Sequence, residues 1–186
     1  MAYNQIPFKT SRGICAYVEV AGVAGLPLGN IFPHKSGGGR TFPNFTCLIS
    51  SFSEEQDNPG CWHVSILLSI RTACTPGAQP GSEYASEALV GAIVDLFEDT
   101  VGDDRSALAD AITAAGRGWA VDASGGVDDA QVAFAAANAD MALFKVDSIK
   151  PLQGGTSTAE QAEKSVCWVD DFPFELVVRA TEATEP

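Results

Sequence analysis

The stretch from Cys61 to Thr72, CWHVSILLSIRT, constrains the fold more than any other part of the chain. Large apolar side chains occupy every second position, and mostly polar ones fill the positions between them. This two-residue period is typical of a β-strand in a sheet that buries one face only. The apolar face carries Trp62, Val64, Ile66, Leu68 and Ile70, and the opposite face carries His63, Ser65, Leu67, Ser69 and Arg71. We therefore expect a one-sided sheet.

Other segments are expected to extend this sheet. Asn44 to Ser53 is a second strand, and the polar turn Glu54 to Gly60 after it predicts an antiparallel hairpin with Cys61 to Thr72. Later in the chain, the pattern predicts three further strand segments at Met141 to Lys150, Ser165 to Val169 and Phe172 to Ala180. The polar run Gln153 to Lys164 is interpreted as a connection between them.

Helical periods appear on both sides of the hairpin. Phe8 to Val23 fits a strand and a helix, and we favour the helix. Ser82 can cap a helix that covers the inner face of the hairpin. Its apolar stripe is Ala85, Leu89, Ala92, Ile93, Leu96 and Phe97.

A third helix is expected after a short break. Asp103 or Asp104 can cap it, and it would continue through Ala115 until Gly116 and Gly118 end it. We expect it to pair with the helix before it.

This order of elements separates helices from strands, which favours the α+β class. The chain has 186 residues and no internal repeat, so we expect a single domain over residues 1–186. The expected architecture is an antiparallel or mixed sheet of about four strands, covered on one face by helices. A Gly-rich loop near residues 34–40 and a frayed C-terminal tail complete it.

Charge and cysteine content exclude several classes of partner. The net charge of −13 would repel phosphate backbones and anionic lipids, so we expect neither nucleic-acid recognition nor a membrane. No run approaches the ~18 apolar residues of a membrane span, and no apolar leader follows Met1. Because the five cysteines form no C-x-x-C pair, we expect reduced thiols in a protein made in a cytoplasm.

No catalytic centre can be read from the sequence. The histidines available as bases are His34 and His63. Cys61 would share a strand face with His63, but two residues along a strand span ~6.6 Å and no third group orients the imidazole. His34 leads into Gly37 to Arg40, which lacks the Gly-Lys-Ser/Thr ending of a phosphate-binding loop. We expect no enzyme activity and no cofactor.

The paired aspartates and the aromatic residues can be explained without a metal site or a ligand pocket. The pairs Asp103-Asp104 and Asp128-Asp129 stand where helix N-termini favour negative charge, and Asp170-Asp171 is interpreted as a polar break before the last strand. Aromatic side chains at alternate strand positions are typical of a core or an interface, although they can also line a pocket. These aromatic residues are Trp62, Trp119, Trp168, Phe172 and Phe174.

Five segments in sequence order carry a likeness to a known family. They are GNIFP at Gly29 to Pro33, FPNFTCLIS at Phe42 to Ser50, CWHVSILLSIRT at Cys61 to Thr72, SEYASEALVGAIVDLFED at Ser82 to Asp99, and FPFELVVRAT at Phe172 to Thr181. This order resembles the tail-terminator and head–tail completion (neck) proteins of tailed bacteriophages. The Ala-rich part from Val127 to Ala139 has no counterpart in the resemblance.

The resemblance implies a structural subunit of the virion, assembled in the host cytoplasm. Such a subunit would form a homo-oligomeric ring between head and tail and contact other tail or neck proteins, without a catalytic residue. The candidate subunit contacts are His34, Lys35, Arg40, His63 and Arg71. Two alternatives remain: a non-catalytic module that binds a small ligand or a protein, and an enzyme of unrecognised type.

Overall fold

The computed structural model describes residues 6–33, 41–74, 82–98, 105–124, 143–162 and 165–181. These residues form three α-helices and one mixed sheet of six strands. The α+β class is therefore confirmed, with more strands than the four expected. The Gly-rich loop at 34–40 and residues 182–186 of the tail lie outside the described residues.

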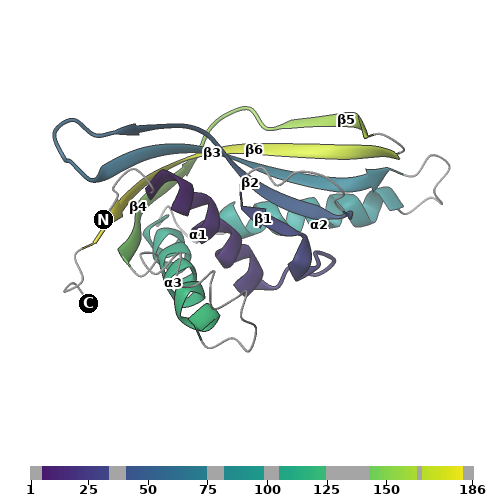
Figure 1. Ribbon diagram of the computed structural model, residues 1–186. Coiled ribbons are helices and arrows are strands. Elements are labelled where there is room, and N and C mark those ends of the chain that lie inside the picture. Colours follow the sequence, from purple (N-terminus) through teal and green to yellow (C-terminus); the bar gives the residue numbers. More distant parts are fainter. Residues whose placement is uncertain are drawn as a thin grey trace.

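The sheet has its longest strand in an inner position. Its strands are β1 (Ile31–Pro33), β2 (Asn44–Glu54), β3 (Cys61–Cys74), β4 (Phe144–Pro151), β5 (Thr156–Ala162) and β6 (Ser165–Ala180). The order is β1-β2-β3-β6-β4, and β5 also pairs with β6 (Figure 1). Only β1 and β2 run parallel, so the predicted β2–β3 hairpin is confirmed.

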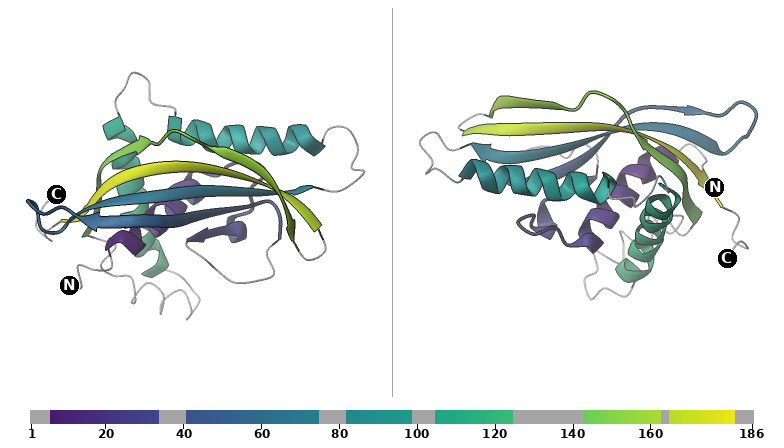
Figure 2. Two further views of the ribbon diagram at one scale, coloured as in Figure 1. Left: turned by 90° about the horizontal axis from the view of Figure 1, so that it is seen from above. Right: turned by 180° about the vertical axis from the view of Figure 1, so that it is seen from behind.

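All three helices lie on the same side of this sheet (Figures 1 and 2). They are α1 (Ile6–Ala21), α2 (Ser82–Glu98) and α3 (Arg105–Ser124), and a short 3₁₀ turn, η2 (Leu28–Asn30), leads into β1. The predicted apolar face of β3 is buried beneath them, with Val64, Ile66, Leu68 and Ile70 at most 1% exposed. Removal of this apolar surface from water is the main stabilising contribution to the fold.

Helix α1 packs closely against the sheet. Ile14 is fully buried, and the Ser11 hydroxyl donates a 2.8 Å hydrogen bond to the carbonyl oxygen of Cys47 on β2. A Cβ atom on Gly13 would lie 2.6 Å from Cε1 of Phe144, inside van der Waals contact. Glycine at this position therefore permits α1 to approach β4.

Strand β6 is continuous, so the predicted polar break at Asp170-Asp171 is wrong. Pro173 fits inside it because the pairing with β5 ends at Asp171 and the pairing with β4 begins at Phe174. The carbonyl oxygen of Pro173 accepts a 2.8 Å bond from the Leu152 N–H in the connection between β4 and β5. A backbone N–H at position 173 would point to the same gap between β4 and β5, where no strand offers a carbonyl oxygen to accept it. The absence of this N–H in proline therefore breaks no ladder hydrogen bond.

Two further expectations are corrected. Residues Thr156–Ala162 form β5, where the sequence predicted a connection, because β6 offers them a full ladder of partners. Helix α3 continues through Gly116 and Gly118 to Ser124 and packs chiefly against α1 and β4, not α2. The cost of a helical glycine, about 1 kcal/mol, is offset there by tertiary contacts.

Candidate functional site

The sheet face that points away from the three helices is called the open face here. Among the described residues, no helix covers it (Figure 1). Strand register places side chains of β2, β3, β4, β5 and β6 on it, at positions where β3 and β6 alternate away from the core. Its acidic and basic members are His63, Arg71, Lys145, Asp147, Lys150, Glu160, Asp171, Glu175 and Arg179.

Glu175 is the centre of the first charge cluster. Lys150 Nζ on β4 donates to its Oε2 across 2.8 Å, and His63 Nδ1 on β3 lies 3.2 Å from its Oε1. The hydrogen bond from Lys150 holds the pKa of Glu175 below its usual value, and the contact with His63 acts in the same direction. The cluster therefore connects three strands on the open face.

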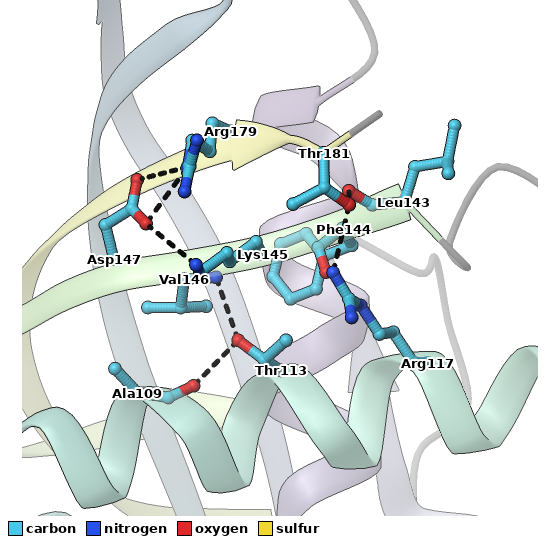
Figure 3. Close-up of polar contacts among 10 residues, drawn as sticks. All are labelled: Ala109, Thr113, Arg117, Leu143, Phe144, Lys145, Val146, Asp147, Arg179 and Thr181. Carbon is cyan, nitrogen blue, oxygen red and sulfur yellow. Dashed lines mark hydrogen bonds and ion pairs between the residues drawn. The ribbon is translucent and has the colours of Figure 1, made fainter. Parts of the chain in front are cut away.

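Asp147 is the centre of the second cluster, shown in Figure 3. It stands at a register shift between Val146 and Ser148, so the bulge gives β4 one extra residue there. Arg179 Nε on β6 lies 3.1 Å from both carboxylate oxygens of Asp147, and Lys145 Nζ lies 4.0 Å away.

The third cluster crosses β6. Arg71 on β3 and Glu160 on β5 approach to 3.6 Å, although the strand between them is β6. Arg71 is registered with Val169 and Glu160 with Cys167, so the ion pair passes over both, and each is 2% exposed. The open face is thus a polar layer over small buried side chains.

Replacing Glu175 by glutamine tests whether the first cluster stabilises the fold, because the stability difference between wild type and variant should depend on pH. Folding lowers the pKa of Glu175 from its ordinary value of 4.5, so the ionised carboxylate stabilises the folded state above pH 4.5. This stabilisation is lost as the pH falls through the pKa that Glu175 has in the folded state. Because Lys150 is 63% exposed, screening limits the contribution to about 1 kcal/mol or less. Urea unfolding should show wild type more stable than Glu175→Gln at pH 7, with a difference that shrinks as the pH falls below 4.5. A difference that does not change with pH, or one that Asp95→Asn on α2 reproduces, contradicts this.

Side chains from α3 cap the backbone of the edge strand β4 (Figure 3). Arg117 Nε donates to the carbonyl oxygen of Phe144 across 2.9 Å. The Thr113 hydroxyl accepts from the Val146 N–H at 2.9 Å and donates to Ala109 O at 2.8 Å. These bonds use backbone groups that would otherwise be free to pair with another strand.

A groove of about 580 Å³ lies between α2 and the β5–β6 part of the sheet. Trp168, 40% exposed, and Phe172 contribute aromatic surface from β6. Glu87 on α2 and Asp170 on β6 add carboxylates to the lining. The groove is thus apolar with two acidic groups, and it lies on the helix side of the sheet.

The chemistry of the thiols disfavours a cysteine nucleophile. Burial and the neighbouring Glu55 raise the pKa of Cys61 to about 11, and burial raises that of Cys47 to about 12. These thiols stay protonated near neutral pH, and only the thiolate is a good nucleophile. His63 shares the face of Cys61, as expected, but its Nδ1 lies beside Glu175.

Other classes of site receive no support within the described ranges. No group of three or more His, Cys, Asp or Glu side chains there is arranged to hold a metal ion. None of the helices described is both long and apolar enough to cross a membrane.

Of the predicted contacts, His63 and Arg71 lie on the open face, each in a charge cluster. His34, Lys35 and Arg40 lie outside the described residues. Sequence reasoning missed Lys150, Asp147, Glu175 and Arg179. The alternation in FPFELVVRAT placed Glu175 and Arg179 opposite the apolar positions, so that signal was present. The groove was anticipated only through Trp168 and Phe172, as aromatic residues that can line a pocket.

Comparison with known proteins adds no family: no family model matches the chain, and no curated protein does.

Proposed function

We propose that this chain is a structural assembly subunit of a tailed-phage virion. In this proposal it is a tail terminator or neck (head–tail completion) protein that forms a homo-oligomeric ring between head and tail. The observation that carries the proposal is the open face, where every described helix lies on the other side and three charge clusters include His63 and Arg71. The order of elements in the sequence, which resembles that of such proteins, supports it further.

The open face suits a contact whose register must be fixed. A closed ring needs a head-to-tail interface, in which one surface meets a different surface of the next copy. Charges held in place by neighbours favour one alignment and oppose others. Lys150 and Glu160 are 63% and 53% exposed, so both can also interact with a neighbouring subunit.

Reversing one charge on the open face tests the proposal. Lys150→Glu should shift sedimentation velocity profiles from an assembled species towards monomer, with at least a tenfold weaker association. The comparison variant is Asp110→Lys, a charge change of the same size and opposite sign at an exposed position of α3. Equal assembly of wild type, Lys150→Glu and Asp110→Lys would show that the open face is not the contact.

The second candidate function is a non-catalytic binding module. The groove beside Trp168 favours it, because concave sites with mostly apolar linings and a few polar groups are typical of ligand binding. A thermal-shift screen of small molecules tests this alternative, since a ligand that binds only the folded state raises the melting temperature.

A further inference from the structure

The edges of the sheet are not equally protected. α3 side chains cap β4 at Phe144 and Val146. On the opposite edge, β1 covers the first part of β2, and a register shift between Ile49 and Ser51 distorts the rest. β5 pairs regularly with β6 from end to end, and no described residue is shown bonding to its other edge. Among the described strand edges, the outer edge of β5 is therefore the one that is regular and has no strand or capping side chain bonded to it.

The composition of β5 does not block the addition of another strand. Its sequence, TSTAEQA, has neither lysine nor proline, the residues that commonly protect an edge. β4 carries both, as Lys145, Lys150 and Pro151. Residues Thr156 to Glu160 of β5 are all exposed. The free backbone N–H and C=O groups of such a strand are a template for a further strand.

The groove adjoins this edge. Ser157 of β5 lines it, and the register pairs Ser157 with Asp170 and Ala159 with Trp168. The side chains of Ser157 and Ala159 are small, and the indole of Trp168 stays 40% exposed beside them. A strand added to β5 would direct every second side chain to this side of the sheet.

The residues that line the groove indicate which side chains of an added strand would bind there. Val90 and Val94 of α2 offer apolar surface, and Glu87 and Asp170 offer negative charge. An aromatic face such as that of Trp168 also attracts a cation. The net charge of −13 on the whole chain acts in the same direction at long range.

We propose that β5 and the adjoining groove bind an extended basic segment of another protein by strand addition. The segment carries Arg or Lys two residues away from apolar side chains, so that both face the groove. Main-chain hydrogen bonds to β5 provide affinity, and the groove provides specificity. This inference goes beyond the ring and holds whether or not the chain assembles into one.

The first experiment uses the peptide acetyl-Thr-Leu-Thr-Arg-Thr-Leu-Thr-amide and isothermal titration calorimetry on the full chain. Two N-methylated forms are compared: one is methylated on the backbone nitrogens of both Leu and the Arg, the other on those of the last three Thr. In strand addition only alternate N–H groups face β5. One form should therefore lose at least tenfold in affinity while the other keeps it. Equal affinities of all three peptides, or no binding of any, overturn the proposal.

Variants of the chain locate the site. Glu87→Lys should weaken binding of the peptide at least tenfold and favour a version with Glu in place of Arg. Asp95→Lys, an equal charge change at an exposed position of the same helix outside the groove, should leave both affinities unchanged. Trp168→Thr should also weaken binding without unfolding the chain, since Trp168 is 40% exposed.

Two other occupants give different results. Acetyl-arginine-amide binding as tightly as the peptide would identify a site for a small cation. Loss of self-association in Glu87→Lys, together with no peptide binding, would identify a second copy of the chain as the occupant. Either result overturns the proposal.

Discussion

Replacement of Phe97 by alanine is expected to lower the free energy of unfolding by about 3 to 5 kcal/mol. Phe97 is 1% exposed, and it lies where α2 meets both α1 and the sheet. Its ring centroid is 5.7 Å from that of Tyr17 and 5.5 Å from that of Phe174. Truncation removes the apolar side chain and leaves a cavity that three elements would have to close.

Urea denaturation monitored by circular dichroism measures this effect. The matched control is Leu28→Ala, because Leu28 is 62% exposed and its truncation should change stability by less than about 0.5 kcal/mol. A loss below about 1 kcal/mol for Phe97→Ala would mean that α2 is not held to the sheet at this contact.

Replacement of Thr113 by valine should have the second largest effect. Valine keeps the shape of the side chain but removes the hydroxyl, which leaves the buried N–H of Val146 without its 2.9 Å partner. An unsatisfied buried donor costs about 1 to 3 kcal/mol. The bond from the Thr113 hydroxyl to the carbonyl oxygen of Ala109, which is also buried, is lost as well.

Amide hydrogen exchange distinguishes the loss of this one hydrogen bond from a lower stability of the whole fold. The Val146 amide should exchange at least tenfold faster in Thr113→Val, relative to amides on β3 in the same sample. Thr113→Ser keeps the hydroxyl and should restore the protection of this amide. Unchanged protection in Thr113→Val would show that the hydroxyl does not cap β4.

The fold was predictable where burial imposes a period. β3 alternates between a covered and an open face, and the run from Trp62 to Ile70 reports that directly. The stripe on α2 is equally direct at Leu89, Ile93 and Phe97, which are all buried. Such patterns are reliable because shifting the register by one residue would move apolar side chains from the buried face to the solvent.

The errors arose where a neighbour decides the local structure. Nothing apolar marks β5, since Thr156 to Glu160 are exposed and their strand form comes from pairing with β6. Asp170-Asp171 was interpreted as a polar break, but both residues stay within β6 because β3 and β5 pair with them. Gly116 and Gly118 normally end a helix, yet α3 continues because Arg117 between them bonds to Phe144.

The site was predictable in part for the same reason. His63 and Arg71 follow from the alternation of β3, but Glu175, the partner of His63, is 112 residues further along the chain. Only tertiary pairing reveals that the two meet. The groove combines α2, β5 and β6, so no local pattern contains it.

Native mass spectrometry of the wild-type chain over a range of concentrations tests the central proposal most directly. We expect one assembled species with a fixed copy number of three or more, since a head-to-tail contact that closes stops at a definite ring. A strictly monomeric chain at high concentration, or an open-ended series of sizes, would contradict it.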